Sequence, residues 1–487
     1  MVSRKSIRDA LFEAEKVYAD LWPIIATLRG DGELENLSAL PKFQVNLFDA
    51  LATLEELYRS LKQEEKQRVA RRMQVSPRWF IARMRKLKVY RQHVVDMIDI
   101  GRALGDAFAW WFYENDREKL AEHTRKQRQK LLPPGIGRAG ERAVVENLRM
   151  FGEKMMLYHG ITDSLRVGDF SLIDLRARRC VGLVEAKTSP PADGRIGVSL
   201  NIVAEQPLEL PEAGPSSSAN EERPTEPAEN ASEQTIDPLF MTRLRRQIEE
   251  MKVTLRDPQQ VDDIDLLKSV GLRAFNHFAT IDQAMREMTP GRAGLASTDE
   301  GHLFAAVPMT GVHRFDPARS MSEGTINRIF AGLADELMAV MLPDRADNAL
   351  HMYTLNDCVR GFGAHRLPLQ YWPLDTEHVR RIVLGEVMLV AAYNPAHFHR
   401  RLEAMGFALE LDLEKRLTAA RKVIADRELR LEAFSYFYSD LATGTLSLAN
   451  IQYMFEQMSE TIDTRGGNQR VDIRPVMHRF KPASLGS

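Results

Sequence analysis

The segment RVGDFSLIDLRARRCVGLVEAKTS, residues 166–189, holds two apolar runs separated by a short basic stretch. Asp169 stands at the start of the first run, and Glu185 and Lys187 close the second. The runs predict an antiparallel hairpin with its turn centred on Ala177. Asp169 and Glu185 are equally far from Ala177, so this hairpin places them opposite each other.

Alternation of side chains along the two strands predicts a charged and an apolar part on one face. That face carries Asp169, Ser171, Ile173, Leu175, Val181, Leu183, Glu185 and Lys187. The opposite face carries Phe170, Leu172, Val184 and Ala186. Both faces are largely apolar, which is typical of a strand pair buried on both sides.

Two carboxylates at the end of a buried hairpin repel each other and need a positive charge nearby. Lys187 supplies one, and a divalent cation would supply more. Oxygen ligands of this kind suit Mg²⁺ or Mn²⁺. A metal site beside a lysine can activate water and stabilise charge on a phosphate, which predicts phosphodiester hydrolysis. The alternative is an ordinary hairpin with three charged residues at one solvated end.

The pattern of Asp169 followed by Glu185-x-Lys187 comes after an amphipathic helix, GRAGERAVVENLRMFG, at 137–152. Together they resemble the core of the PD-(D/E)xK nuclease superfamily, in which a helix carrying a glutamate precedes the hairpin. The resemblance implies a restriction-endonuclease-like α/β core, with a central mixed sheet flanked by helices. It also implies an Mg²⁺-dependent deoxyribonuclease, most simply an endonuclease, that hydrolyses DNA phosphodiester bonds.

The resemblance gives each residue of the pattern a role. It implies that Asp169 and Glu185 bind Mg²⁺ (or Mn²⁺), with the backbone carbonyl of Ala186 as a further ligand. Lys187 would position the attacking water. Glu141, in the preceding helix, would be an outer ligand or a partner of metal-bound water.

Three other positions bear on the resemblance. Glu146, about one turn beyond the helix glutamate, is the alternative to it. Gln247 lies in a later helix, at a position that such folds sometimes use. Gly168 precedes the hairpin aspartate where the name of the superfamily has proline.

Changes in composition predict the division of the chain into segments. Residues 1–132 have helical periodicity, residues 133–258 form the nuclease-like domain, and residues 259–487 are an α+β region of unknown role. Residues 205–236 are rich in Pro, Glu, Ser and Ala, which predicts a disordered acidic insertion. Within the C-terminal region we expect a strand at 302–309 and helices at 322–341, 376–393 and 412–441.

A dense basic stretch lies in the N-terminal region and includes QRVARRMQVSPRWFIARMRKLKVYRQH at 67–93. Only Glu64 and Glu65 oppose its basic residues, which attract phosphate backbones. The basic residues are Lys62, Lys66, Arg68, Arg71, Arg72, Arg78, Arg83, Arg85, Lys86, Lys88 and Arg91.

The segment 67–90 also resembles a helix-turn-helix, with a QVSP turn between two helices. On this interpretation Arg78, Arg85 and Lys88 face a DNA groove. Two alternatives remain: a solvated charged face of a helical bundle, and a second helix that simply runs on. The aromatic segment AFAWWFYEN at 107–115 is interpreted as core or subunit interface.

The 487-residue chain has a formal net charge of −2 and two cysteines, which excludes a disulfide framework and a Cys-rich zinc site. No apolar run approaches the ~20 residues of a membrane span. We therefore expect a cytoplasmic protein whose partner is DNA, acting in bacterial restriction, phage (antiviral) defence or repair. A homo-oligomer or a regulatory protein partner is expected to restrain it. The alternative function is a non-catalytic nucleic-acid-binding or scaffold protein with a nuclease-like fold.

Overall fold

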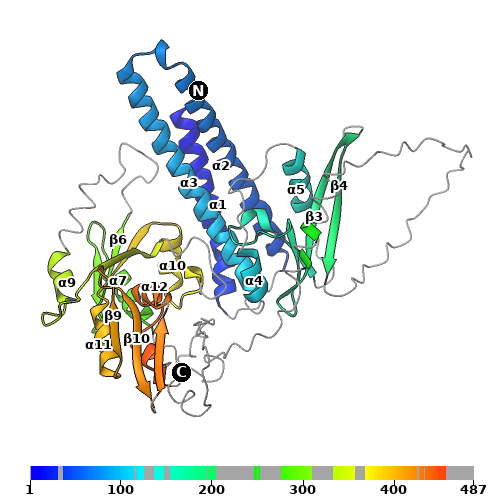
Figure 1. Cartoon of the computed structure of the whole chain (residues 1–487). Coiled ribbons are helices and arrows are strands. Elements are labelled where there is room, and N and C mark those ends of the chain that lie inside the picture. The colour runs from blue at the N-terminus through cyan, green and yellow to red at the C-terminus, as the bar shows by residue number, and fades with distance from the viewer. Residues whose placement is uncertain are drawn as a thin grey trace, which may run out of the picture.

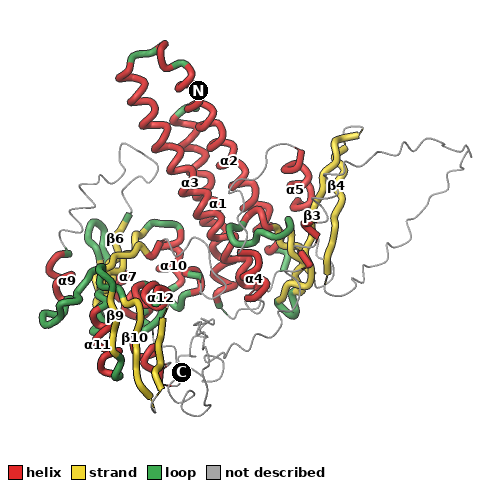
Figure 2. The backbone as a smooth tube through the Cα atoms, in the orientation of Figure 1, coloured by secondary structure: helices red, strands yellow, loops and turns green. Residues whose placement is uncertain are grey.

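The computed structural model describes most of the chain, and its helices and strands are drawn in Figures 1 and 2. The described residues are 2–30, 37–113, 117–124, 136–146, 154–192, 195–204, 246–248, 251–252, 276–309, 333–356, 368–424, 427–432, 434–453 and 455–456. The predicted acidic insertion at 205–236 lies outside them.

Three long helices lie side by side and form the N-terminal part of the protein (Figure 1). They are α1 (Arg4–Arg29), α2 (Ala39–Ala70) and α3 (Pro77–Tyr113), and the short α4 (Arg117–Thr124) follows. Five leucines of α2 repeat every three or four residues and all are buried: Leu47, Leu51, Leu54, Leu57 and Leu61. This periodicity places one apolar stripe against the neighbouring helices and confirms the predicted helical region.

The junction between α2 and α3 corrects the helix-turn-helix predicted at 67–90. After α2 ends at Ala70, a single 3₁₀ turn spans η1 (Arg72–Gln74), and α3 then continues unbroken from Pro77 to Tyr113. A helix-turn-helix has two helices that cross at a steep angle, whereas α2 and α3 run alongside each other (Figure 1). The alternative of a second helix that runs on is the one observed.

The aromatic segment near the end of α3 lies in the core, as predicted. Phe108 stacks on Phe43 of α2 with ring centroids 4.3 Å apart. Trp110 lies 4.5 Å from Tyr371, a residue of η4 (Leu369–Tyr371) in the C-terminal half. The base of the helical bundle is therefore packed against the C-terminal half of the chain.

The first sheet has the strand order β1-β2-β3-β4, and every neighbouring pair is antiparallel. Its strands are β1 (Lys154–Tyr158), β2 (Phe170–Asp174), β3 (Arg179–Ala192) and β4 (Arg195–Ala204). α5 (Ile136–Glu146) packs on β3 and β4. The sequence predicted a mixed sheet, but the described strands of this sheet are all antiparallel. Their connections are too short for the crossover that a parallel pair needs.

Two further antiparallel sheets form the C-terminal half, with orders β5-β6-β8-β7 and β11-β10-β9. The strands are β5 (Gly294–Ser297), β6 (His302–Pro308), β7 (His351–Thr354), β8 (Val387–Tyr393), β9 (Ala408–Leu411), β10 (Leu417–Ile424) and β11 (Arg427–Glu432). The helices are α7 (Phe278–Glu287), α9 (Ala334–Ala339), α10 (Thr376–Val383), α11 (Ala396–Ala404) and α12 (Ser435–Ala442). The predicted strand at 302–309 is confirmed as β6.

Two predicted helices are wrong in large part. The segment 376–393 begins as α10, but Gly385 adopts a φ of 61° and ends the helix. The residues that follow form β8, which pairs with β6 on one side and β7 on the other. In 412–441 the strands β10 and β11 pair as a hairpin before α12. Of the predicted helix at 322–341, the described residues contain α9.

The three predicted segments share one core. A continuous cluster of buried apolar residues runs from Ile7 in α1, through Val184 in β3, to Ala391 in β8. Backbone carbonyls also join the segments: Arg29 Nη2 donates to the carbonyls of Trp372 and Leu374 at 2.8 and 2.9 Å. The helical bundle is therefore the support on which the first and second sheets are both held.

None of the described helices has the length and apolarity needed to span a membrane.

Candidate active site

The hairpin of β2 and β3 brings Asp169 and Glu185 to the same end of the sheet. The ladder begins at Phe170, which pairs with Val184, and Asp169 and Glu185 directly flank this pair. The backbone N–H of Asp169 donates to the carbonyl of Val184 at 2.8 Å. This bond links Asp169 to the residue before Glu185, so the regular ladder ends at Phe170 and Val184. A bulge after Leu172 shifts the register only near the turn.

The carbonyl of Ala186 points toward the same edge as Asp169. Backbone groups two residues apart in a strand face the same neighbour, and the carbonyl of Val184 faces β2. Accordingly, the N–H of Ala186 donates to Asp169 Oδ2 at 2.9 Å. The predicted third ligand and the predicted carboxylate are therefore adjacent.

Lys187 lies between two side chains that come from different parts of the chain. Its Nζ is 2.7 Å from Glu185 Oε1 and 2.9 Å from Gln247 Oε1. Glu185 is buried, and its carboxylate is stabilised by this ion pair. Gln247 belongs to the helical residues after the long acidic segment, so folding returns the chain to the hairpin at this point. We call Asp169, Glu185 and Lys187 the hairpin cluster.

Gly168 explains the departure from the proline in the superfamily name. Its φ is +73°, a left-handed conformation that glycine adopts readily. Proline is fixed near −65° and cannot adopt it. A Cβ at this position would also lie 3.1 Å from the carbonyl oxygen of Val184 and 3.3 Å from Met251 Sδ. The tight turn into β2 therefore requires glycine in this protein.

Glu141 lies on α5 and its carboxylate accepts a hydrogen bond from the hydroxyl of Tyr158. Tyr158 pairs with Phe170, so this contact is at the same end of the sheet as the hairpin cluster. α5 approaches β3 closely, because a Cβ on Gly140 would lie 2.1 Å from Thr188 Oγ1. The alternative residue, Glu146, is exposed and paired with Arg142, and is not directed at the cluster.

The donor set of the hairpin cluster suits a hard divalent cation. Two carboxylates and one backbone carbonyl are oxygen donors, which Mg²⁺ and Mn²⁺ prefer. Among the described residues, no three or more His, Cys, Asp or Glu side chains form a group able to hold a metal. Asp169, Glu185 and the Ala186 carbonyl would therefore have to hold the ion together with water or substrate oxygens.

A buried chain of hydrogen bonds, which the sequence did not predict, supports the turn before Asp169. His123 Nδ1 accepts from the backbone N–H groups of Arg166 and Val167 at 3.2 and 3.1 Å. A ring nitrogen that accepts carries no proton, so the neutral imidazole carries its proton on Nε2. That nitrogen lies 3.1 Å from the hydroxyl of Tyr113 and donates to it.

The other donors and acceptors in this chain of hydrogen bonds can then be assigned in turn. The Tyr113 hydroxyl lies 2.6 Å from Ser171 Oγ, which lies 2.6 Å from His159 Nε2. The Tyr113 hydroxyl donates to Ser171, and the Ser171 hydroxyl donates to His159 Nε2. His159 therefore carries its proton on Nδ1. That N–H donates to the carbonyl of Gly168 at 3.0 Å. The relay (His123, Tyr113, Ser171, His159) therefore fixes the backbone next to Asp169 from α3, α4 and β2.

A second buried network joins the helical bundle to the loop 162–165. Arg102 of α3 binds Glu55 of α2 at 3.2 Å and Asp163 of the loop at 3.0 Å. Asp106 Oδ1 accepts from the N–H groups of Asp163 and Ser164, both at 3.0 Å. Burial, with a smaller effect from the Asp163 carboxylate, raises the pKa of Asp106 to about 7. The loop leading to Asp169 is thus held by charges that are costly to bury.

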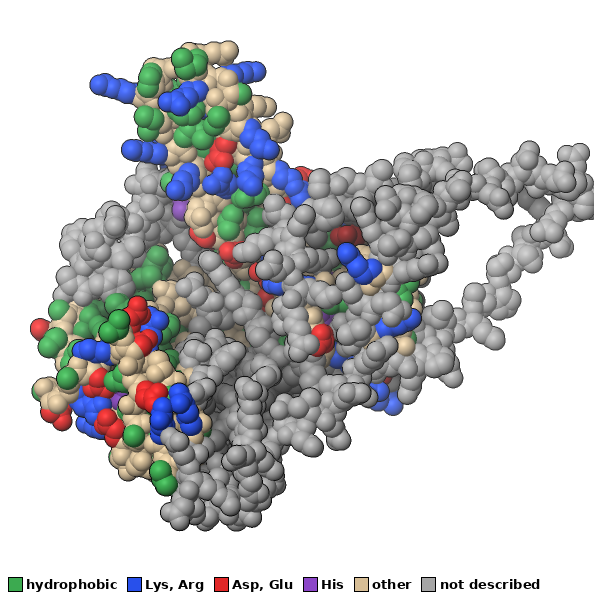
Figure 3. Space-filling view, viewed as in Figure 1, with side chains coloured by type: hydrophobic (Ala, Val, Ile, Leu, Met, Phe, Trp, Pro, Cys, Tyr) green, Lys and Arg blue, Asp and Glu red, His purple; other side chains and the backbone are tan. Residues whose placement is uncertain are grey.

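The predicted DNA-contacting residues are not near the hairpin cluster. Arg78, Arg85 and Lys88 are exposed on the first turns of α3. This end of the helix projects beyond the rest of the protein, and Lys and Arg side chains gather there (Figure 3). Phe80 and Met84 are half-buried and Leu87 is buried, so these three turn inward.

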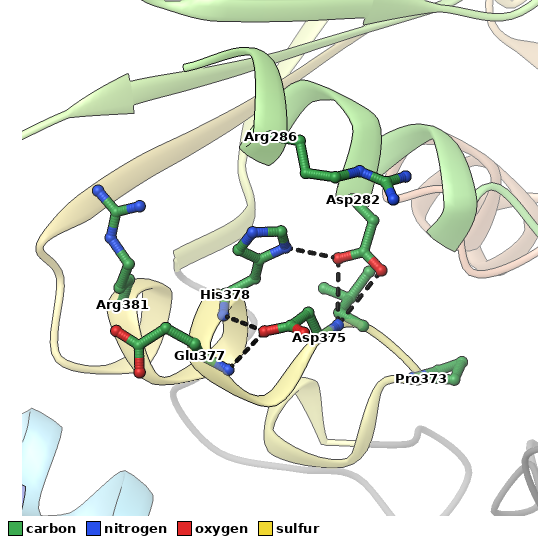
Figure 4. Close-up of a pocket in the computed structure, with 8 residues that line it drawn as sticks. Asp282, Arg286, Pro373, Asp375, Glu377, His378 and Arg381 are labelled. Carbon is green, nitrogen blue, oxygen red and sulfur yellow. Dashed lines mark hydrogen bonds and ion pairs between the residues drawn. The ribbon is translucent and has the colours of Figure 1, made fainter. Parts of the chain in front are cut away.

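A surface pocket of about 520 Å³ lies between α7 and the start of α10 (Figure 4). Asp282 accepts from His378 Nδ1 at 2.8 Å and from the backbone N–H of Asp375 at 3.1 Å. Asp375 in turn caps α10 by accepting from the N–H of Glu377. These acids are used to join the two helices, so we assign the pocket a structural role.

Comparison of the chain with protein-family models, with curated proteins and with solved structures finds no match.

Proposed function

We propose that this protein is a metal-dependent nuclease that hydrolyses DNA phosphodiester bonds, most simply an endonuclease, through a restriction-endonuclease-like core. The observation that carries the proposal is the hairpin cluster. Asp169 and Glu185 flank the Phe170–Val184 pair at one end of the sheet, and the ammonium of Lys187 lies 2.7 Å from Glu185. The side chain of Gln247 holds this ammonium from the other side.

The order of elements also supports the proposal. α5 with Glu141 comes first, then β1, then the β2–β3 hairpin, and then the helical residues with Gln247. This is the order that the resemblance to the PD-(D/E)xK superfamily implies. The bacterial cytoplasm, and a part in restriction, phage defence or repair, belong to the proposal on the same basis.

Each residue has a role under this proposal. Asp169, Glu185 and the carbonyl of Ala186 would hold Mg²⁺ or Mn²⁺. The ion would supply positive charge for the phosphate and lower the pKa of a water. Lys187 would orient the attacking water by donating a hydrogen bond. Glu141 would act through water.

The test is DNA cleavage by the full chain with Mg²⁺, with Mn²⁺ and with EDTA. We expect Lys187→Ala and Asp169→Asn to lower the cleavage rate by at least about 100-fold. The asparagine keeps an acceptor for the N–H of Ala186, so the fold is preserved. Asp174→Asn is the matched control, because this carboxylate of the same hairpin accepts from Ala177 N–H at the turn. Cleavage that is unaffected by both cluster variants would refute the proposal.

A non-catalytic nucleic-acid-binding protein is the second candidate. It is favoured by the ammonium of Lys187, which already has two protein partners. DNA binding without cleavage under either metal, unchanged in Lys187→Ala, is the result expected of this candidate.

A further inference from the structure

The far end of the α2–α3 hairpin carries positive charge that the protein does not neutralise. We call residues 62–91 the arm tip. Its two acids are already paired: Glu64 binds Arg83 at 2.7 Å and Arg68 at 3.5 Å, and Glu65 binds Arg91.

The other basic residues of the arm tip are all exposed, and none of their side chains makes an ion pair or hydrogen bond within the described residues. These eight residues are Lys62, Lys66, Arg71, Arg72, Arg78, Arg85, Lys86 and Lys88. Lys62 and Arg72 lie over the rings of Tyr58 and Phe80. Figure 3 shows the Lys and Arg side chains distributed along the projecting part of the bundle. Eight cations without an acidic partner repel one another, so this surface favours a polyanionic partner.

The arm tip also exposes apolar side chains. Met73 is 95% exposed, Val69 56% and Ile81 50%. Trp79 is 41% exposed, and the guanidinium of Arg68 lies 5.0 Å from its ring centroid. Apolar and aromatic groups among cations are found where proteins contact bases or the edges of grooves.

The distribution of charge favours nucleic acid over an anionic lipid surface. From Arg78 to Lys88 the cations extend about 15 Å along α3, at 1.5 Å per residue. The polar headgroup layer of a bilayer is only about 5–8 Å thick on each side. A membrane touching the end of the arm would therefore leave much of this charge unpaired, whereas a rod-like duplex lying along the arm would not.

The length of α3 fixes how far this surface lies from the hairpin cluster. Gly105 of α3 packs so closely on the loop before β2 that a Cβ there would lie 2.0 Å from the carbonyl oxygen of Ile161. Twenty-seven residues separate Arg78 from Gly105 on this one helix, and they span about 40 Å. At 3.4 Å per base pair, 40 Å corresponds to about 12 base pairs of duplex.

We infer that the arm tip is a remote anchor for duplex DNA, which holds backbone phosphates about one helical turn from the bond at the hairpin cluster. Contact with DNA does not depend on cleavage, whereas the distance to a scissile bond rests on the proposed function. The anchor is rigid because α3 is continuous from the tip to the loop that carries Asp169.

Fluorescence anisotropy of labelled duplexes of about 10 and about 30 base pairs tests this inference. The measurement uses the full chain in EDTA, where binding is read without cleavage. For Arg71→Gln, Arg72→Gln, Arg78→Gln and Arg85→Gln combined, we expect affinity for the long duplex to fall at least tenfold. The slope of log K against log salt should become shallower by about 2–4. The combined variant should also lose the preference of the wild type for the long duplex.

The matched control neutralises four exposed arginines in the C-terminal half: Arg286, Arg292, Arg400 and Arg401. We expect it to bind both duplexes as the wild type does. Unchanged DNA affinity in the arm-tip variant would overturn the inference, as would loss of binding to vesicles of anionic phospholipid with no effect on DNA. Because binding is measured in EDTA, the test remains valid even if the hairpin cluster does not cleave DNA. If the protein cleaves DNA but the arm-tip variant binds it as the wild type does, the anchor is refuted and the nuclease proposal is not.

Discussion

The hairpin cluster and the arm tip use the same kinds of charged residue in opposite ways. In the hairpin cluster, Glu185 is buried and Lys187 has a protein partner on each side. In the arm tip, eight cations are exposed and form no ion pair within the described residues. Burial makes an unpaired charge costly, so the fold must supply its partners. Exposure removes that requirement, so the charge of the arm tip is available to a ligand.

The comparison depends on a stiff connection between the two regions, and Gly105→Ala tests that connection. Helix propensity alone would favour alanine by about 1 kcal/mol. The new Cβ would, however, meet the carbonyl oxygen of Ile161 at 2.0 Å, and backbone must move. We therefore expect the free energy of unfolding to fall by about 2–3 kcal/mol. Urea denaturation measures this free energy, with Lys88→Ala at an exposed position as the control. An unchanged denaturation midpoint would show that the contact between Gly105 and Ile161 is not tightly packed.

The pH dependence of stability tests the contact between α3 and the loop before β2, because the buried carboxyl of Asp106 lies there. Its pKa is raised from 3.8 to about 7, so the folded protein binds this proton more tightly than the unfolded chain does. Stability from this group is therefore present at low pH and is lost as pH rises toward 7. Asp106→Asn should remove that loss, which we expect to be roughly 2 kcal/mol between about pH 5 and about pH 8. Parallel pH profiles of unfolding for variant and wild type would contradict this.

Ser171→Ala tests whether the relay supports the hairpin cluster. The variant removes the hydroxyl between Tyr113 and His159 and leaves the accepting nitrogen of His159 without its donor. A buried polar group that loses its partner costs about 1–3 kcal/mol. We expect a loss of stability of that size. Ser60→Ala, at an exposed serine of α2, is the control. A neutral Ser171→Ala would mean that the relay does not hold this turn.

Trp79→Ala should have the smallest effect on stability. The ring is 41% exposed and its described contact is the guanidinium of Arg68. Surface substitutions of this kind usually change stability by less than about 0.5 kcal/mol. A loss above about 2 kcal/mol in thermal unfolding would show that the arm tip is a structural surface rather than a free one.

Several features of the fold could be predicted from local sequence. The leucine repeat of α2 identifies a buried helix, and the symmetry of the hairpin about Ala177 places Asp169 opposite Glu185. The observed register from Phe170 to Leu172 agrees with that symmetry, because the bulge after Leu172 lies on the turn side of these residues. The basic character of the arm tip was also evident, because a run of basic residues with only two acids can be read without tertiary information.

Other features could not be predicted because their causes lie far away in sequence. The residues of β10 and β11 favour helix by composition, but each strand gains a partner that overrides that preference. β8 was mistaken for helix because both its neighbours, β6 and β7, are separated from it by long stretches of chain.

The sequence by itself determined which residues are charged, which segments have helical or alternating periodicity, and that Asp169 and Glu185 belong to one hairpin. Only the tertiary structure decided that Gln247 contacts Lys187, that four buried polar side chains fix the turn before Asp169, and that the arm tip lies far from that turn. Periodicity and symmetry act between neighbours in the chain. Hydrogen bonds in the core join residues that only the packing of helices against the sheet brings together.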